Sequence, residues 1–226
     1  MRAHPLDRPI WTSLVTRQKA LAFGDERARR IDPAYGVFAV ARDASDESRA
    51  ALTDLVRVHG VSALVEAEPP DVPPGLEVLS RDVLWQMTAE EVKLVGPDFA
   101  WVELTDDDAP EMLALAGLTR PGPFSSRTHQ LGDFVGIKRD GALIAMAGER
   151  MKPDGFTEVS GVCVHPDHRG HGYAAGLMSV VAERIVARGE TPFLHVYDHN
   201  VPAIAIYEAL GYRLRRLMAM VTVRAR

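Results

Sequence analysis

The residues best suited to chemistry lie between positions 159 and 177, where a strand, a glycine-rich turn and a helix follow one another. The β-branched run 159–164 predicts a buried strand, which Pro166 ends because proline lacks a backbone N–H. Gly170 and Gly172 follow, and then a helical pattern begins. The first turn of a helix has free N–H groups and a partial positive charge, and glycines let an anion approach the backbone. This order of elements predicts a phosphate-binding turn.

Known phosphate-binding motifs can be compared with this turn. The Walker motif is absent, because no Gly-Lys-Ser/Thr follows the glycines. The dinucleotide fingerprint G-x-G-x-x-G/A is met by Gly170, Gly172 and Ala175. However, residues 165–169 separate this turn from the strand, Asp198 lies too far along to be the ribose-binding acid, and only one β-α-β unit is visible. A nicotinamide- or nucleotide-binding oxidoreductase that uses Gly170-x-Gly172-x-x-Ala175 is therefore kept as an alternative.

A third pattern fits best. The stretch Val162-x-Val164-x-Pro166-x-x-Arg169-x-x-Gly172-x-Ala174 resembles the acetyl-CoA-binding motif of the GNAT (GCN5-related) N-acetyltransferases, in which Q/R-x-x-G-x-G/A follows a strand and a proline turn. The stretch 195–212 resembles that family's second signature: a strand, an Asn, a short helix bearing Tyr, then Gly and an aromatic, here Asn200, Tyr207, Gly211 and Tyr212. With the preceding hairpin the resemblance reaches back to about residue 99 and says little about the chain before it.

The resemblance implies that acetyl-CoA, as a cosubstrate, contacts both the strand and the turn. The strand would offer backbone groups to the pantetheine arm and an N–H to the thioester oxygen, while the turn would hold the diphosphate. Ala174 stands where the family more often has a second glycine. The implied contact residues are Val162, Cys163, Val164, Arg169, Gly170, His171, Gly172, Tyr173, Ala174, Ala175 and Asn200.

The resemblance also suggests catalytic residues. Tyr207 occupies the position of the family's general acid, although its helical spacing also fits core packing. Two side chains are candidates for the base that deprotonates the amine. Glu158 lies on the motif strand, and His195, at the start of the next strand, stands where relatives often carry Glu. An imidazole titrates near pH ~6.5 and suits this task, but both candidates fit a packed or solvated side chain equally well.

Composition limits the other classes of function. The chain has 226 residues and a net charge of −5, which argues against general binding to nucleic acids or acidic membranes. No apolar run is long enough to span a membrane, and no signal-peptide core is visible at the start. A single cysteine, Cys163, excludes an intrachain disulfide and suits a reducing compartment, so we expect a cytoplasmic protein. Its place within a strand indicates a buried apolar residue rather than a nucleophile.

A metal site is a further alternative, because several histidines lie close together in the sequence. Pro166 and Gly170 break any helix that could align them as ligands, so we expect no metal. The acids 106–108, followed by Pro110, predict the N-terminus of a helix rather than a metal site, because adjacent acidic side chains point in different directions. The histidines concerned are His165, His168, His171, His195 and His199.

Hydrophobic periodicity places the expected elements. In the first part we expect a helix, a strand, a helix capped by Ser45, and further strands. In the second we expect a strand, a helix, an irregular loop at 119–129 that lines the acceptor pocket in the resemblance, and a hairpin turning at Asp140-Gly141. The expected ranges are 10–23, 45–60, 110–116 and 175–188 for the main helices, and 35–40, 61–65, 76–87, 100–104, 132–138, 142–150, 156–164, 193–197 and 213–223 for the strands.

These elements predict two domains in an α+β (α/β) chain. Residues 98–226 should form the GNAT-like domain, a mixed and mostly antiparallel sheet with flanking helices. Residues 1–97 should form a smaller α/β domain, either a degenerate relative of the second or a lid over the substrate. The function predicted is an acetyl-CoA-dependent N-acetyltransferase that acts on a primary amine of a small molecule or peptide, by direct attack in a ternary complex. A CoA-binding sensor without turnover is the alternative outside enzymes.

Overall fold

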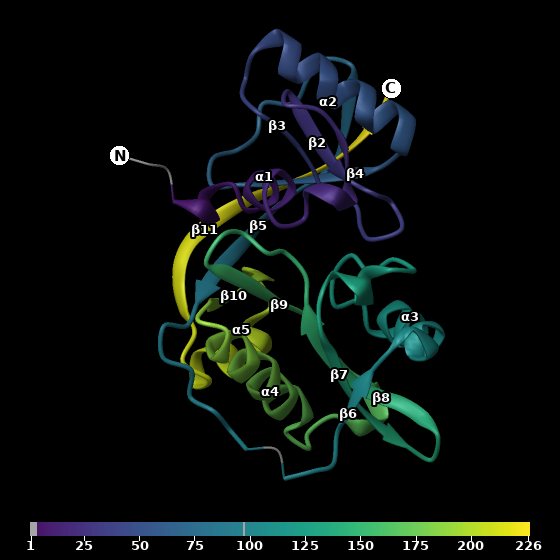
Figure 1. Cartoon of the computed structure of the whole chain (residues 1–226), viewed down its shortest axis with the longest axis vertical. Coiled ribbons are helices and arrows are strands. Elements are labelled where there is room, and N and C mark those ends of the chain that lie inside the picture. Colours follow the sequence, from purple (N-terminus) through teal and green to yellow (C-terminus); the bar gives the residue numbers. More distant parts are fainter. Residues whose placement is uncertain (1–3, 97) are drawn as a thin grey trace.

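The computed structural model describes residues 4–96 and 98–226, and its centre is an eight-stranded sheet (Figure 1). The strand order is β4-β11-β5-β10-β9-β8-β7-β6. All neighbouring pairs in this sheet are antiparallel except β9 and β10, which run parallel. The mixed, mostly antiparallel α+β fold expected from the sequence is therefore confirmed. The strands are β4 (Ser62–Glu66), β5 (Leu76–Thr88), β6 (Val102–Leu104), β7 (Phe134–Arg139), β8 (Ala142–Glu149), β9 (Phe156–Val164), β10 (Thr191–Tyr197) and β11 (Arg213–Ala225).

The helices lie around this sheet, and a small antiparallel sheet of three strands covers one end of it (Figure 1). That small sheet packs with α1 and α2, while α4 and α5 lie against the lower part of the large sheet. None of the described helices is both long and apolar enough to cross a membrane. The helices are α1 (Pro9–Val15), α2 (Asp46–His59), α3 (Ala109–Thr119), α4 (Tyr173–Ala187) and α5 (Val201–Ala209), and the small sheet is β1 (Ala22–Gly24), β2 (Ala28–Ile31) and β3 (Ala39–Ala41).

The large sheet draws strands from both sides of the expected domain boundary. β4 and β5 come from the first part of the chain, yet the last strand, β11, lies between them and pairs with both. β5 in turn pairs with β10, which borders the motif strand β9. The division into 1–97 and 98–226 stays a prediction, but the two parts share one sheet.

Local capping signals predicted several boundaries correctly. Ser45 accepts a hydrogen bond from the Ser48 N–H and begins α2. At the acidic cluster, Thr105 and Asp108 form a capping box, which confirms the helix-start interpretation. The hairpin turn between β7 and β8 has Asp140 and Gly141 at positive φ, as its sequence predicts.

The expected helix over 10–23 is wrong beyond its first half. α1 ends at Val15, a short 3-10 turn follows, and Ala22 already pairs with Ile31 in the small sheet. Ser13 and Thr16 bond back to carbonyls four residues earlier, an interaction that weakens a helix interior. Strand pairing with a distant segment therefore overrides the local helical pattern. β2 was not expected at all, and of the strand expected at 35–40 only the end falls in β3.

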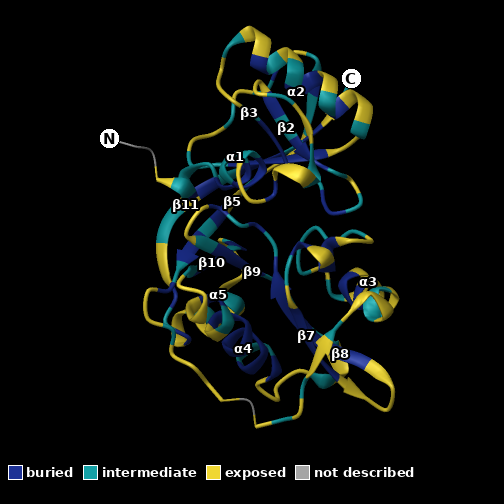
Figure 2. Ribbon diagram, viewed as in Figure 1, coloured by how far each residue is buried: buried dark blue, intermediate teal, exposed yellow. Residues whose placement is uncertain are grey.

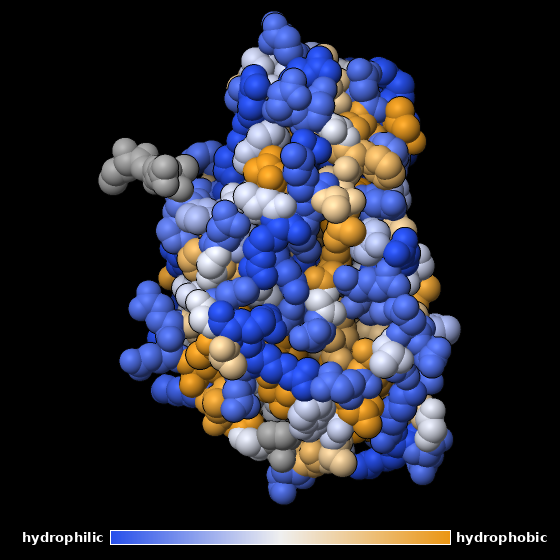
Figure 3. Space-filling view, viewed as in Figure 1, coloured by the Kyte–Doolittle hydropathy of each residue, from blue (hydrophilic) through white to orange (hydrophobic). Residues whose placement is uncertain are grey.

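Helix α4 fixes the position of the glycine turn. It is buried along most of its length, whereas α2 and α3 each have one exposed face (Figure 2). The surface at the top of the molecule, where α2 lies, is mostly hydrophilic (Figure 3). Leu177, Met178, Val181 and Ile185 pack into the main core, and burial of each such side chain contributes about 1.5–3 kcal/mol. The N-terminus of α4 is therefore held rigidly against the sheet, with the turn directly before it.

Candidate active site

Strands β9 and β10 separate part-way along the sheet. They pair with each other only from Thr191↔Phe156 to Phe193↔Glu158. Beyond this point β9 is paired only with β8, and β10 only with β5. A register shift against β8 accompanies this change, because residues 160–163 of β9 span a shorter stretch of β8. Gly161, with φ 64°, supplies the backbone conformation that this bulge requires. The result is an opening between two strands with backbone groups along its walls.

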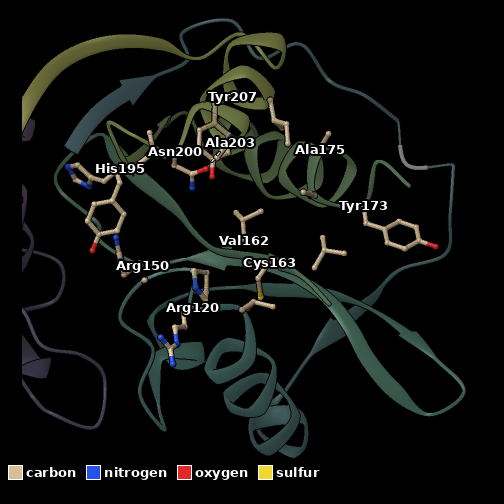
Figure 4. Close-up of a pocket in the computed structure, with 18 of the residues that line it drawn as sticks. Arg120, Arg150, Val162, Cys163, Tyr173, Ala175, His195, Asn200, Ala203 and Tyr207 are labelled. Carbon is tan, nitrogen blue, oxygen red and sulfur yellow. Dashed lines mark hydrogen bonds between the residues drawn. The ribbon is translucent and has the colours of Figure 1, made fainter. Parts of the chain in front are cut away.

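A cavity of about 560 Å³ occupies this opening (Figure 4). It runs from the glycine turn, along β9 and α5, to side chains of the first part of the chain such as Phe38 and Val65. All the predicted cofactor contacts line it, as do Tyr207 and His195, whereas Glu158 does not. Every predicted site residue except Glu158 therefore lines one cavity, and Glu158 contacts His195 from behind it.

The turn before α4 presents unpaired N–H groups. Gly170 and Gly172 have φ values of 83° and 74°, and no atom lies within 4 Å of the position where either would carry a Cβ. In the described part of the chain, the backbone N–H groups of residues 170–175 have no hydrogen-bond acceptor. Tyr173 contributes backbone only, since its ring packs against Phe99 away from the cavity (Figure 4). This arrangement fits an anion such as a diphosphate.

Glu158 lies behind the cavity in a buried ion pair. Arg150 donates to both of its carboxylate oxygens, from Nε and Nη2, each at 2.8 Å. His195 Nδ1 lies 2.8 Å from the same carboxylate. Burial alone would raise the pKa of Glu158, but the guanidinium of Arg150 and the contact with His195 hold that pKa well below its usual range. A carboxylate so strongly stabilised in its ionised form is a poor proton acceptor.

Hydrogen bonds also assign the tautomer of His195. Arg215, which can only donate, contacts Gln86 Oε1 at 2.8 Å, so the Gln86 amide nitrogen faces the other way. That nitrogen donates to the Leu6 carbonyl and lies 3.0 Å from His195 Nε2, which must therefore accept. His195 is thus neutral with its proton on Nδ1, directed at Glu158. Both of its ring nitrogens are occupied although the residue borders the cavity.

Tyr207 and Cys163 both face the cavity as protonated groups. Burial raises the pKa of Tyr207 to about 12, and no hydrogen-bond partner of its hydroxyl is found among the described residues. Burial likewise raises the pKa of the Cys163 thiol to about 11. Tyr207 is therefore available as a proton donor, whereas Cys163 lacks the thiolate character of a nucleophile. Asn200 caps α5 by accepting from the Ala203 N–H.

Comparison with known proteins decides the family. A family model described as FR47-like protein matches residues 134–221. A solved structure from Novosphingobium aromaticivorans DSM 12444, of a protein assigned to the GNAT family of acetyltransferases, is 44% identical, and the match covers 99% of this chain and 100% of that one with a TM-score of 0.91. The chain belongs to the GNAT family. This confirms the resemblance seen in the two sequence motifs and extends it to the first part of the chain.

Other solved GNAT structures share the fold alone. A GCN5-related N-acetyltransferase from Kribbella flavida is 19% identical, with 99% of this chain and 96% of that one covered and a TM-score of 0.67. A GCN5-related N-acetyltransferase-like protein from Streptococcus suis 89/1591 is 17% identical, with 95% and 92% covered and a TM-score of 0.54. No curated protein matches the chain in sequence.

The GNAT fold removes the structural basis of the dinucleotide alternative. A dinucleotide-binding domain needs a doubly wound parallel sheet, whereas here β9 and β10 are the parallel pair in a sheet otherwise antiparallel over the described strands. The glycine turn is also separated from β9 by a short 3-10 helix, Pro166–His168. Among the described residues, no group of three or more His, Cys, Asp or Glu side chains could hold a metal ion.

Sequence reasoning missed the residues that close the far end of the GNAT cavity. Phe38, Val65, Leu84 and Met220 come from four distant segments and carry no local signal of function. Arg150 could have been noticed, because a charged residue directly after the apolar strand 142–149 requires a partner once buried. The partner, Glu158, lies on β9, which pairs antiparallel with β8 and places Glu158 opposite Arg150.

Proposed function

We propose that this chain is an acetyl-CoA-dependent N-acetyltransferase that acetylates a primary amine by direct attack in a ternary complex. The observation that carries the proposal is the single cavity that joins the unpaired N–H groups of residues 170–175, the opened edges of β9 and β10, and Tyr207. Acetyl-CoA would supply an activated acetyl group as a thioester. The family relation to a GNAT protein of 44% identity supports the same activity.

The residues of this chain would divide the work along the cavity. The turn 170–175 would bind the diphosphate, with the positive end of the α4 dipole favouring its charge. The free backbone of β9 around Val162 would orient the pantetheine arm and the thioester carbonyl. Tyr207, neutral at any working pH, would protonate the leaving thiolate.

The geometry disfavours both predicted bases. Glu158 is ionised, fully buried and held at both oxygens by Arg150, and it does not border the cavity. His195 borders the cavity, but its Nε2 lone pair accepts from Gln86. We therefore propose that the acceptor binds as the neutral amine and that its proton passes to water, while Glu158 and His195 hold Arg150 in place. Their catalytic role stays a prediction that pH profiles will test.

The test combines binding and turnover. Titration calorimetry should show binding of acetyl-CoA, and a free-thiol assay over a panel of amines should show release of CoA only when an acceptor is present. Binding of acetyl-CoA without amine-dependent release over the whole panel would favour the sensor without turnover. Absence of acetyl-CoA binding would overturn the proposal.

A further inference from the structure

The end of the cavity away from the glycine turn is mostly apolar. Figure 4 shows His195 and Arg150 at this end, opposite Ala175 and Tyr173. Its buried apolar lining comes from both parts of the chain, and the aromatic ring of Tyr197 adds to it. An occupant of this space gains stability by burying an apolar body. The apolar side chains are Phe38, Val65, Leu84, Met151 and Met220.

The charges along the cavity are all of one sign. Among the described residues that line it there is no Asp or Glu, whereas Arg120, Arg150 and Arg169 are present. Glu158 balances the charge of Arg150, so the remaining positive charge comes from Arg120 and Arg169. An acceptor with several ammonium groups would find no carboxylate in the lining to pair with, so the cavity disfavours polycationic acceptors.

Arg150 has one nitrogen left for a ligand. Its Nε and Nη2 both donate to Glu158, but no acceptor for Nη1 is found in the described residues. Nη1 lies 3.8 Å from the position that a Cβ on Gly122 would occupy, and Gly122 itself lines the cavity. The side chain is only 11% exposed, and its two hydrogen bonds to Glu158 hold it in place. A buried, oriented guanidinium edge is well suited to a carboxylate oxygen.

Arg120 provides a second cation on the same wall. It ends α3 in the left-handed conformation, with φ 51°, which is uncommon for a residue other than glycine. This turn directs the following loop, Pro121–Pro123, along the cavity, and Arg120 itself is exposed and lines it. In Figure 4 it lies on the same side as Arg150, across from Tyr207 and Asn200.

We propose that the acceptor is an amine with an apolar body and a carboxylate, of the kind found in a free apolar amino acid. Arg150 Nη1 holds the carboxylate, Arg120 adds positive charge that favours it, and the apolar end of the cavity holds the side chain. This rests on the proposed acetyl transfer. In that transfer the amine nitrogen bonds to the thioester carbonyl carbon, the carbon–sulfur bond breaks, the amine loses one proton to water, and the sulfur gains one.

Acceptors that differ only in the carboxylate test the proposed class of acceptor. With acetyl-CoA in excess, kcat/KM is measured for leucine and phenylalanine, for their amides, for isoamylamine and phenethylamine, and for spermidine. The free amino acids should exceed their amides and the decarboxylated amines on the order of 10- to 100-fold, the range expected for a charge-assisted contact. The amine of an amino-acid amide is less basic than that of the free amino acid, so more of it is neutral at a given pH. Without a carboxylate contact, the amides should therefore react faster than the free amino acids. Equal or faster reaction of amides, simple amines or spermidine overturns the proposal.

A binding measurement does not depend on turnover. In the presence of CoA, N-acetyl-leucine should raise the melting temperature of the protein, and N-acetyl-leucinamide should raise it less. Arg120→Gln should reduce that difference, because only Arg150 Nη1 then remains for the carboxylate, and should raise KM for leucine several-fold with acetyl-CoA affinity unchanged. Arg57→Gln, a matched change at an exposed arginine on α2, should leave both as in the wild type. The same response to both N-acetyl compounds overturns the proposal.

The two failures are distinguishable. If acetyl-CoA does not bind, the proposed function itself is wrong. If acetyl-CoA binds and amides, simple amines or spermidine are acetylated at least as fast as the amino acids, the transferase stands and the carboxylate-bearing acceptor is wrong.

Discussion

At the scale of single residues, Tyr207 is defined by what surrounds its hydroxyl. The ring packs at the edge of the main core, while the hydroxyl faces the cavity without a partner among the described residues. A pKa of about 12 keeps the phenol protonated, so it has a proton to donate, but it also makes the phenol a weak acid, and donation therefore depends on its alignment with the leaving sulfur. Packing and proton donation are thus compatible in one side chain.

Tyr207→Phe separates these two roles. The ring and its packing remain, but the proton is lost, so turnover should fall about 10²–10⁴-fold with little change in acetyl-CoA affinity. The measurement is steady-state turnover together with titration of acetyl-CoA. The neighbouring Tyr212→Phe serves as the control, since Tyr212 is buried and does not line the cavity. Near-normal turnover of Tyr207→Phe would mean that Tyr207 contributes to packing only and does not donate the proton.

A second residue-scale prediction concerns the base. If the acceptor binds as the neutral amine, the acidic limb of the pH–rate profile should follow the pKa of the acceptor's own amine. That limb should therefore shift when acceptors of different basicity are compared. In His195→Gln the position of that limb should not change. The check is turnover between about pH 5.5 and 9.5 for both proteins. A limb near pH ~6.5 that is present in the wild type and lost in His195→Gln would instead make His195 the base.

The buried pair of Glu158 and Arg150 makes a prediction about stability. The folded-state pKa of Glu158 lies below the usual value of 4.5 that the unfolded chain has, so the stabilisation is complete above that pH and is lost as the pH falls toward the folded-state pKa. Glu158→Gln leaves the Arg150 charge without its partner and should cost about 3–5 kcal/mol near neutrality.

Urea unfolding of wild type and Glu158→Gln at several pH values from 7 to about 3 measures this difference. The gap in unfolding free energy should narrow below pH ~4.5, because only the wild type loses stability there through Glu158. Glu26→Gln, at an exposed carboxylate without a side-chain partner among the described residues, should show no such gap. A constant gap at all pH values would mean that Glu158 is not held in its ionised form.

At the scale of elements, sequence reasoning succeeded where the signal is local. The strand 159–164, the proline after it and the glycines before α4 lie within one short segment, and the structure places them as expected. Ser45 and the Asp140-Gly141 turn are further examples, since capping and turn conformation depend on adjacent residues. It failed for β2 and the end of the first helix, where pairing between distant segments decides the structure.

The turn and α4 together make the prediction for cofactor binding. Gly172→Asp should place a carboxylate where the diphosphate is proposed to bind, and repulsion should lower acetyl-CoA affinity at least 100-fold. Gly189→Asp, at the other end of α4, is the matched control: both glycines have φ near +75° with open space around them. Titration calorimetry with acetyl-CoA on both folded variants measures this difference in affinity. Unchanged affinity in Gly172→Asp would exclude this turn as the diphosphate site.

At the scale of the whole molecule, the first part of the chain does more than cover the second. It contributes β4 and β5 to the large sheet and Phe38, Val65 and Leu84 to the cavity. The hydrogen-bond chain from Asp7 through Arg215 and Gln86 reaches His195, so the N-terminal segment also supports the buried ion pair. These long-range relations have no short motif, which explains why the sequence left the role of this part open.

This shared sheet predicts that residues 98–226 do not fold by themselves. Without β5, both β10 and β11 lose a neighbour, and buried residues such as Phe193 and Met218 become exposed. The fragment should be insoluble or lack a cooperative melting transition, while a fragment of residues 70–226, which keeps β5, should be the better folded of the two. Circular dichroism melts and acetyl-CoA titration compare both with the full chain. Cooperative unfolding of the fragment 98–226 with retained acetyl-CoA binding would instead support an independent domain that begins at residue 98. The pairs that β4 and β5 form with β10 and β11 would then be dispensable for the fold.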